Sequence, residues 1–333
     1  MGKRRRHHIR KQLHIIKRHG LKYEIESIKN RLFSFYDMSE ESILRFQNYY
    51  ENLDESQYEE ELVEWFNDEM GYKMNINHPL TFCEKMQWLK LNDRDPIKTE
   101  LADKYSVRKW VENKIGEEYM VPLKGVWNSA EDIPYEEMPQ RFVVKCNHGS
   151  GMNVIVKNKD AVDWGKIKSR VAKWQLINYA HINGGFELHY EGIKKRIVVE
   201  EYLEDLAGAL YDYKFYCFGG EPQFVIVIGN RSERHHSGCE KCYDMNWRFL
   251  DWPLRDYPLF STEIPKPQRF SEMKSIAKTL SEGFRFVRID LYEANGKIYF
   301  GEMTFIPSNG VFPYRDMWTH SRDCELGSMI SLI

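Results

Sequence analysis

The first part of the chain carries a helical pattern of apolar side chains. Tyr58, Leu62 and Phe66 recur every four residues with acidic residues between them, and Trp65 widens the same face. This spacing is typical of an amphipathic helix with one buried face. We therefore predict a helical N-terminal extension over residues 1–70.

A second helical stretch is predicted over residues 101–112, after a break at Asn77-His78-Pro79. Lys104 and Arg108 are four residues apart in this stretch. Side chains with that spacing project from one face of a helix, so the two cations are expected side by side.

The chain becomes rich in strand patterns from Arg141 onward. Short runs of β-branched and aromatic residues predict strands over residues 142–145, 153–156, 197–202, 213–218, 223–228, 286–291 and 297–303. Helices are predicted near 163–179 and 269–282, and Gly219-Gly220 and Asn295-Gly296 are turn signals. This order of elements predicts an α+β fold with antiparallel sheets, because strands and helices do not alternate as in a parallel sheet.

Length and charge narrow the possible functions. A chain of 333 residues can form two or three lobes, and a net charge of -2 with a pI near 6.6 gives no general attraction to nucleic acid. Residues 3–22 are nevertheless strongly basic, whereas residues 38–69 are acidic with Arg45 as their single base. We favour the interpretation that these stretches pair with each other or are solvated. The alternative is that the basic arm makes peripheral contact with an anionic membrane or a polyanionic substrate.

The cysteine pattern and the absence of long apolar runs bear on location. Six scattered cysteines in a chain of this length indicate free thiols and a reducing compartment. No apolar run approaches the roughly 20 residues of a membrane span. The basic N-terminus has no apolar stretch behind it, as a secretory signal would. We expect a cytoplasmic protein, with the inner face of the membrane as the place where the basic arm would act.

A candidate phosphate-binding segment follows the first predicted strand. Alternation along residues 141–146 puts Val143 and Lys145 on one strand face, so Lys145 ends the strand beside an apolar surface. The next residues, 147–151, are small and contain two glycines, which let backbone N–H groups approach anionic oxygen closely. An ordinary hairpin turn remains the alternative, because short glycine motifs have many false positives.

Asp290 and Glu302 form a candidate magnesium site. Mg²⁺ takes a few carboxylates together with phosphate oxygens, so the two acids must share a sheet face. A two-residue turn at Asn295-Gly296 would place them on opposite faces. We therefore predict a three-residue loop over 294–296, which pairs 290 with 300 and 288 with 302 and makes the acids diagonal neighbours. The alternative is a solvated strand face.

Four segments together resemble a known family. They are Phe-Val-Val-Lys-Cys-Asn-His-Gly-Ser-Gly, Val-Glu-Glu-Tyr-Leu, Asp-Tyr-Lys-Phe-Tyr-Cys-Phe-Gly-Gly and Phe-Gly-Glu-Met-Thr-Phe. The chain is similar over roughly residues 75–310 to TupA-like ATP-grasp proteins, which are associated with surface-polysaccharide and teichuronopeptide biosynthesis. The resemblance implies an ATP-grasp domain over 71–333, in which a lid or small lobe (about 141–200) and a metal-binding lobe (about 201–333) clasp ATP.

The resemblance also implies roles for individual residues. It assigns nucleotide contacts to Lys104, Lys145, the lid residues His148, Gly149, Ser150 and Gly151, the hinge residues Glu200, Glu201, Tyr202 and Leu203, and Asp212. It assigns Mg²⁺ to Asp290 and Glu302, and it places Lys214 with Asp212 near the ribose and phosphates, so Lys214 is a candidate to contact the reacting groups. The superfamily usually has Asn two residues after the metal-binding glutamate, where this chain has Thr304, which argues against a direct third protein ligand.

The implied activity is that of an ADP-forming carboxylate–amine ligase. Such an enzyme forms an acyl phosphate from a carboxylate and ATP, and an amine then attacks it. The expected product joins an amino acid or a related group to a cell-surface polysaccharide or its precursor. Arg231 and Arg288 are candidates to bind the carboxylate or the acyl phosphate, with structural salt bridges as the alternative for both.

Two other motifs suggest different functions. Asp93-Arg94-Asp95 matches the Asp-x-Asp pattern of glycosyltransferases that use nucleotide sugars, although its place before Pro96 favours a surface turn. The residues His235, His236, Cys239 and Cys242 have spacing compatible with zinc but lack a second distant pair, so we do not favour that interpretation. A non-catalytic ATP-binding scaffold is the third functional alternative.

Overall fold

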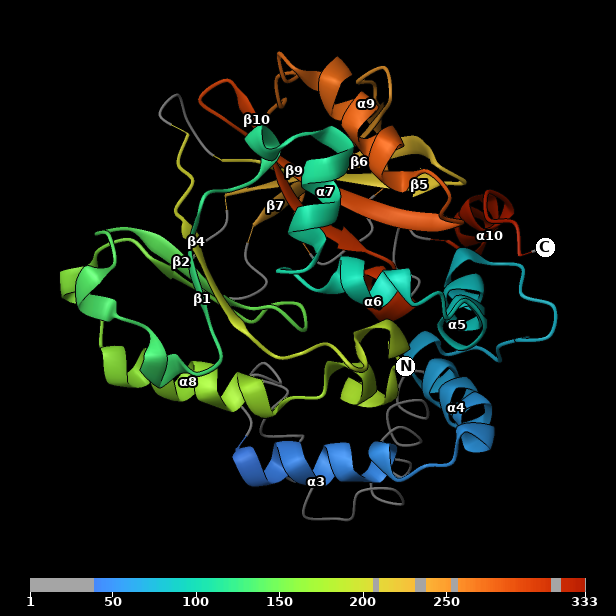
Figure 1. Ribbon diagram of the computed structural model, residues 1–333. Coiled ribbons are helices and arrows are strands. Elements are labelled where there is room, and N and C mark those ends of the chain that lie inside the picture. The colour runs from blue at the N-terminus through green and yellow to red at the C-terminus, as the bar shows by residue number, and fades with distance from the viewer. Residues whose placement is uncertain (1–38, 206–209, 231–237, 253–256, 313–318, 333) are drawn as a thin grey trace.

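A six-stranded antiparallel sheet forms the larger lobe of the computed structural model, which describes residues 39–205, 210–230, 238–252, 257–312 and 319–332 (Figure 1). We call it the large sheet. Its strands in spatial order are β10 (Lys297–Thr304), β9 (Phe286–Ala294), β5 (Asp212–Phe218), β6 (Glu221–Gly229), β7 (Cys239–Asp244) and β8 (Phe249–Leu250). The turn signals at Gly219-Gly220 and Asn295-Gly296 are confirmed, because both dipeptides have positive φ and join neighbouring strands.

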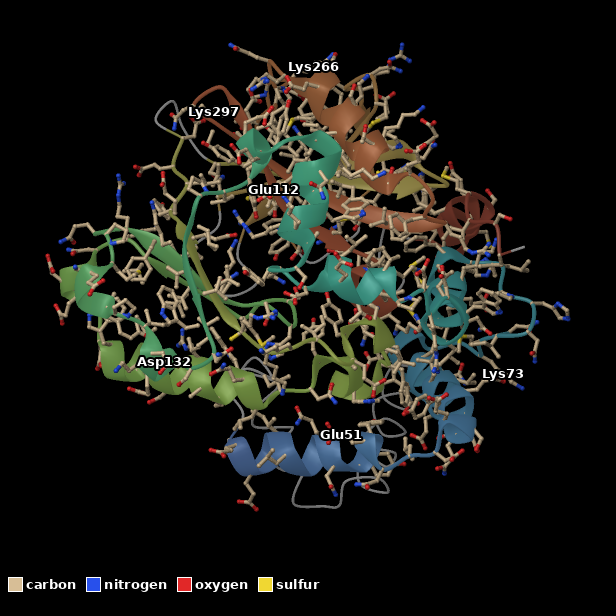
Figure 2. The ribbon with its side chains drawn as sticks, viewed as in Figure 1. Glu51, Lys73, Glu112, Asp132, Lys266 and Lys297 are labelled. Carbon is tan, nitrogen blue, oxygen red and sulfur yellow. The ribbon has the colours of Figure 1, made fainter. Side chains whose placement is uncertain are left out.

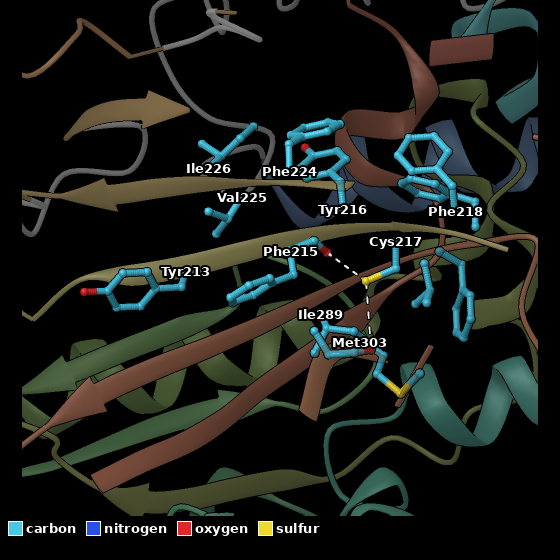
Figure 3. Close-up of a cluster of buried hydrophobic side chains, with 14 of the residues drawn as sticks. Tyr213, Phe215, Tyr216, Cys217, Phe218, Phe224, Val225, Ile226, Ile289 and Met303 are labelled. Carbon is cyan, nitrogen blue, oxygen red and sulfur yellow. Dashed lines mark hydrogen bonds between the residues drawn. The ribbon is translucent and has the colours of Figure 1, made fainter. Parts of the chain in front are cut away.

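Alternation along β5 separates the core from a charged face. Phe215 and Cys217 point to the side covered by α9 (Phe270–Ser281), where the Phe215 ring stacks on Phe270 at 5.9 Å. Figure 3 shows this cluster, in which the Cys217 Sγ also contacts the carbonyl oxygens of Phe215 and Ala277. Residues one position away, among them Lys214, therefore face the opposite side of the large sheet.

The smaller lobe is built on a four-stranded antiparallel sheet, which we call the small sheet. Its strands in spatial order are β1 (Leu123–Trp127), β4 (Ile197–Glu201), β2 (Phe142–Cys146) and β3 (Asn153–Val156). Helix α8 (Trp164–Leu176) lies below this sheet, and α3 (Glu40–Glu51) lies below α8 (Figure 1). β1 was not predicted, so this sheet draws on residues upstream of the 141–200 range expected for the lobe.

Helix α4 (Tyr58–Met70) contributes to the cores of both lobes. Tyr58 and Leu62 pack into the cluster around the small sheet, whereas Phe66 and Met70 pack into the cluster around the large sheet. The i, i+4 pattern in the sequence thus corresponds to a real buried face. α3 and α4 lie within the predicted helical extension, and the predicted helix content of residues 1–38 lies outside the described residues.

The predicted helix over residues 101–112 is wrong in its extent. The chain forms α6 (Ile97–Ala102) and α7 (Val107–Ile115), and the turn between them begins at Asp103. Asp103 is extended, and its carboxylate accepts hydrogen bonds from the Tyr105 N–H (2.8 Å) and the Ser106 hydroxyl (2.8 Å). A short polar side chain that bonds the following backbone favours a turn over a continuous helix. Lys104 therefore lies in a turn and not on a helix face.

Other elements complete the described chain. The remaining helices are α5 (Phe82–Asn92) and α10 (His320–Ser328), which pack on each other. Short 3₁₀ turns occur at Glu55–Gln57, Glu117–Tyr119, Ala130–Asp132, Tyr135–Glu137, Lys159–Ala161, Tyr179–Gly184, Leu188–Tyr190 and Pro307–Gly310. Charged side chains such as Lys73, Asp132, Lys266 and Lys297 lie at the periphery (Figure 2). Within the part of the chain that the structure describes, no helix is both long and apolar enough to span a bilayer.

Candidate active site

Asp290 and Glu302 are directly opposed on β9 and β10. The predicted three-residue loop is wrong, because Asn295-Gly296 is a two-residue turn closed by Ala294 and Lys297. The pairing shifts instead at a bulge between Phe300 and Glu302, so that 290 pairs with 302 and 288 with 304. The extra residue in the strand supplies the change of parity that the loop was expected to supply. We call Asp290 and Glu302 the acid pair.

Gly301 makes this bulge possible. A Cβ atom at this position would lie 2.9 Å from Cε2 of Tyr292 and 3.0 Å from the carbonyl oxygen of Asp290. Only a residue without a side chain lets the two strands approach this closely. The glycine next to the predicted metal ligand therefore leaves room for the close approach of the two strands that position the acid pair.

Basic side chains from β5 and β9 hold the acid pair. Lys214, which pairs with Asp290 across the strands, forms ion pairs with the carboxylates of Asp290 and Asp212, the latter at 2.8 Å. Arg288 donates from Nε and Nη2 to the two oxygens of Asp290 at 2.6 and 2.7 Å. Its Nη2 also lies 2.9 Å from Oε1 of Glu302 and 2.9 Å from Oγ1 of Thr304.

The two acids respond differently to this environment. Burial tends to raise the pKa of Glu302, but Lys104, Arg288 and Lys214 outweigh burial and hold that pKa well below its usual range. Burial dominates for Asp290, whose side chain is 2% exposed, and raises its pKa despite Arg288 and Lys214. Glu302 is therefore a firmly ionised carboxylate at neutral pH.

Lys104 links the smaller lobe to the acid pair. Its Nζ donates to the carbonyl oxygen of Gly149 at 2.5 Å and lies 3.5 Å from Oε2 of Glu302. Its backbone N–H donates to the carbonyl oxygen of Asn147 at 3.2 Å. A turn that begins at Asp103 thus places one ammonium between the 147–151 loop and the metal-binding candidates.

The 147–151 loop is anchored by a buried asparagine. The Asn147 amide donates to Asp103 Oδ1 (2.7 Å) and to the Lys194 carbonyl (2.9 Å), while its Oδ1 accepts from the Arg196 N–H (2.6 Å). Gly151 has a φ of 75°, which favours glycine, and a Cβ on Gly149 would lie 2.4 Å from Cε of Met152. The loop is therefore a fixed turn, with Ser150 exposed at its surface.

His148 points away from the acid pair and into the smaller lobe. Its Nε2 lies 3.2 Å from the carbonyl oxygen of Trp174 on α8, and the residue is 2% exposed. Burial, aided by Lys195, lowers the pKa of His148 to about 4. A neutral, inward-facing imidazole adds no positive charge to the cleft, so any contact of this loop with phosphate would come from its backbone.

Lys145 and Glu200 meet on the small sheet. Lys145 Nζ donates to Oε2 of the buried Glu200, and Arg108 Nη1 donates to Oε1 of the same carboxylate at 2.9 Å. Arg108 Nη2 also bonds the Val121 carbonyl at 2.8 Å. Arg108 was noted in the sequence only for its spacing from Lys104, and nothing in the sequence alone pairs it with Glu200.

The predicted hinge residues leave the small sheet next to the β9–β10 turn. The Glu201 N–H donates to the Pro122 carbonyl at 2.9 Å, and the Tyr202 ring lies 5.6 Å from the guanidinium carbon of Arg141. Just beyond the half-buried Leu203, the Glu204 carbonyl accepts from the Asn295 side chain at 2.8 Å. The hinge therefore lies at one end of β9 and β10, and the acid pair lies farther along these strands.

The Asp-x-Asp motif has local partners of its own. Asp93 forms an ion pair with Lys98 at 2.7 Å, and Oδ1 of Asp95 accepts from the Ile97 N–H at 3.0 Å at the start of α6. Cys239 and Cys242 lie three residues apart on β7 and so point to opposite faces. Arg231, His235 and His236 lie outside the described residues.

The acid pair fits a hard divalent cation in its donor chemistry. Carboxylate oxygens are the ligands that Mg²⁺ prefers, and direct cross-strand pairing brings the two carboxylates within reach of one ion. Across the described ranges, no cluster of three or more His, Cys, Asp or Glu side chains has metal-binding geometry. An ion held by the acid pair would therefore take further ligands from phosphate or water.

A small antiparallel sheet that carries Lys145, a large antiparallel sheet that carries the acid pair, and the ammonium of Lys104 beside Glu302 define a protein of the ATP-grasp class. The chain belongs to the TupA-like ATPgrasp family, whose profile matches residues 84–331. The comparison with curated proteins gave no match.

Several solved structures are similar to the chain. A D-alanine–D-alanine ligase from Bacillus anthracis complexed with ATP is 17% identical, with 62% of this chain and 54% of that chain covered and a TM-score of 0.35. The ATP-grasp ligase PsnB complexed with minimal precursor is 10% identical (71% and 62% covered, TM-score 0.37). An N5-carboxyaminoimidazole synthetase from Staphylococcus aureus complexed with ADP is 16% identical (63% and 45% covered, TM-score 0.32). The chain thus spans 45–62% of the length of these structures.

Proposed function

We propose that the protein is an ADP-forming ligase that joins a carboxylate to an amine through an acyl phosphate. The observation that carries this proposal is the position of Lys104, whose ammonium lies between the Gly149 carbonyl and the Glu302 carboxylate. A cation between a glycine-containing loop and an acid pair suits a nucleotide whose terminal phosphates are neutralised from both lobes.

The nucleotide is proposed to run from the hinge to the acid pair. The backbone of residues 200–203 would read the adenine, with Glu200 and Glu201 nearby. Lys145 and Lys104 would contact the phosphates, together with backbone groups of the 147–151 loop. This path is supported by the Asn295–Glu204 contact, which puts the hinge at one end of β9 and β10. Asp212 would lie near the ribose, one strand away from Asp290.

Asp290 and Glu302 would hold Mg²⁺ in this proposal. The bound ion would neutralise charge on the transferred phosphoryl group. The ionised state of Glu302 supports its role as a ligand. Lys214 and Arg288 contact the acid pair and have N–H groups directed at this region, so they suit the binding of phosphoryl or carboxylate oxygens. Arg231 stays a prediction, because it lies outside the described residues.

The proposed chemistry has two steps. A substrate carboxylate oxygen bonds to the γ-phosphorus while the bond to the β-phosphate oxygen breaks, giving the acyl phosphate and ADP. The amine then attacks the acyl carbon, the carbon–oxygen bond to phosphate breaks, and the nitrogen loses a proton. In both steps negative charge develops on oxygen, and Lys104, Lys214 and Arg288 are positioned to stabilise it.

The test measures release of ADP and phosphate with pools of candidate carboxylates and amines. Release should require both substrates. Asp290→Asn and Glu302→Gln should each lower turnover at least 100-fold, since each removes a charge at the transferred group. Asp95 belongs to the Asp-x-Asp motif of the glycosyltransferase alternative, so under the ligase proposal Asp95→Asn should leave turnover within about twofold of wild type. The reverse pattern with a nucleotide sugar would identify a glycosyltransferase, and tight ATP binding without turnover on any acceptor would identify a scaffold.

The proposed substrate is glycan-linked, and the proposed location is cytoplasmic at the inner face of the membrane. Both follow from the family resemblance and from the basic residues 3–22, which lie outside the described residues. Deletion of residues 1–22 should abolish binding to anionic liposomes while leaving MgATP affinity unchanged. Liposome binding that survives the deletion would remove the membrane contact from the proposal.

A further inference from the structure

Three successive residues just beyond β10 have left-handed backbone conformations. Ser308 (φ 50°, ψ 38°), Asn309 (φ 55°, ψ 22°) and Gly310 (φ 69°) form a turn within Pro307–Gly310. Two of these residues carry side chains, and the left-handed region costs such residues roughly 1–2 kcal/mol each. A strained segment of this kind persists only where its surroundings hold it. We call residues 308–310 the left-handed turn.

Two buried side chains of α5 hold the left-handed turn. Gln87 Nε2 donates to the carbonyl oxygen of Gly310 at 2.8 Å. Lys90 Nζ donates to the carbonyl oxygen and to Oδ1 of Asn309, at 2.8 and 2.7 Å, and to Oε1 of Gln87 at 2.7 Å. An ammonium has three N–H donors, and these three acceptors use them all.

Packing alone does not explain a lysine at position 90. Lys90 is 3% exposed, and burial lowers its pKa to about 7, with Glu187 acting in the opposite direction. Methionine has a similar size and avoids the cost of burying an amine. The lysine provides N–H donors aimed at Asn309 and Gln87, and its ammonium also lies 4.7 Å from the centroid of the Trp65 ring. The fit is also tight, since a Cβ on Gly185 would lie 2.2 Å from Nδ2 of Asn309.

The left-handed turn lies at the end of β10 that is remote from the hinge. The hinge contact at Asn295 marks the beginning of β10, Glu302 and Thr304 lie near its end, and the turn follows. A nucleotide running from the hinge to the acid pair leaves this far end for the group that attacks the activated carboxylate. Ser308 is exposed there.

We propose that Lys90 is a positioning residue that, with Gln87, fixes the left-handed turn as a preformed wall of the amine-binding side of the site. This proposal rests on the ligase function proposed above. It predicts that the lysine acts through the turn and affects the amine substrate, while the nucleotide end of the cleft is unaffected.

The first experiment follows backbone hydrogen exchange in peptides that cover residues 306–311. Lys90→Met should speed exchange there at least tenfold, and Lys90→Arg, which keeps the donors, should stay within about threefold of wild type. Methionine is chosen over alanine because Lys90 borders a cavity of about 100 Å³, from which water could enter a truncated site. Lys85→Met is the matched control, since Lys85 lies on the same helix but bonds the Ile330 carbonyl. Should Lys90→Met fail to fold, Asn309→Gly removes the Oδ1 acceptor and keeps the left-handed conformation accessible.

The second experiment separates this proposal from the ligase proposal. Lys90→Met should raise KM for the amine at least tenfold, with kcat and the affinity for MgATP within about twofold of wild type, and Lys90→Arg should restore most of the loss. Unchanged exchange and unchanged amine KM in Lys90→Met would overturn the positioning role alone. A wild-type protein with no turnover on any amine would overturn the ligase function and, with it, the amine-binding wall.

Discussion

The charged side chains of the site depend on one another for their positions and charge states. Three carboxylates, Asp212, Asp290 and Glu302, meet three cations, Lys104, Lys214 and Arg288, so the cluster is balanced without a ligand. Removing one partner from such a buried group leaves the others uncompensated, which costs more than a surface pair would. The roles of these residues are therefore separable only by variants that keep size and change charge.

The pH dependence of stability should report the buried state of His148. Its pKa is about 4 in the folded protein and near 6.5 in an unfolded chain, so between these values only the unfolded chain takes up the proton. Stability should fall as pH decreases from 6.5 to 4, by up to about 1.4 kcal/mol per pH unit from this residue. Urea unfolding of His148→Gln between pH 4 and 8 should lack this component.

A matched change at an exposed histidine provides the control. His78→Gln replaces an exposed histidine and so controls for the general effect of a His-to-Gln substitution on urea unfolding. An identical slope in wild type and His148→Gln would show that the imidazole is not held neutral by burial.

At the level of elements, the acid pair depends on a strand irregularity and not on a loop. The bulge at Gly301 shifts the pairing so that Asp290 and Glu302 oppose each other. A regular hairpin closed by Asn295-Gly296 would send Glu302 to the other face of the large sheet. The bulge at Gly301 thus determines whether the carboxylates of Asp290 and Glu302 can bind the same ion.

Replacing Gly301 should destabilise this hairpin. The Cβ of Gly301→Ala would lie 3.0 Å from the Asp290 carbonyl oxygen, a backbone atom that cannot rotate away. We expect a loss of about 1–3 kcal/mol in the free energy of unfolding, measured by urea titration. Gly165→Ala in the first turn of α8, where the nearest atom is a side-chain oxygen at 3.3 Å, should change stability little. Equal effects of the two variants would contradict the close approach at Gly301.

The limits of the sequence prediction are visible in the same hairpin. The prediction that Asp290 and Glu302 share a sheet face was correct. The alternation pattern cannot tell a longer loop from a bulge, because either one shifts the pairing of the two strands by one residue. Likewise, the Lys104–Arg108 spacing predicted a continuous helix. The observed turn combines local bonds from Tyr105 and Ser106 to the Asp103 carboxylate with a tertiary bond from Asn147 to the same carboxylate, and the helix spacing shows neither. Runs of β-branched and aromatic residues are a local signal, and they predicted β2, β3, β4, β5, β6, β9 and β10. β1, β7 and β8 lack such runs and were missed.

At the scale of the whole molecule, α4 connects the two hydrophobic cores. Leu62 is fully buried in the core of the smaller lobe and Phe66, one turn later, in the core of the larger lobe. The sequence predicted the buried face of this helix but not its two different cores, because each core also contains residues distant in the chain, such as Trp174 in the smaller lobe and Phe215 in the larger. The two lobes are therefore joined by shared packing on α4.

Substitutions on α4 should reveal this coupling. Leu62→Ala and Phe66→Ala should each cost about 2–5 kcal/mol, because each leaves a cavity in a packed core. Both should shift one common unfolding transition, monitored by near-ultraviolet circular dichroism and tryptophan fluorescence. Glu60→Ala, at an exposed position on the same helix, should have little effect. Two separate transitions, each shifted by only one variant, would show that the lobes unfold independently.

The shared helix also restricts how a nucleotide can reach its place. Two lobes that share one rigid helix are expected to rotate about that helix, so residues far from α4 move farther than residues packed on it. A movement of the lobes that admits a nucleotide would therefore have to keep Leu62 and Phe66 packed in their separate cores. Removing α4 would leave each lobe without part of its own hydrophobic core.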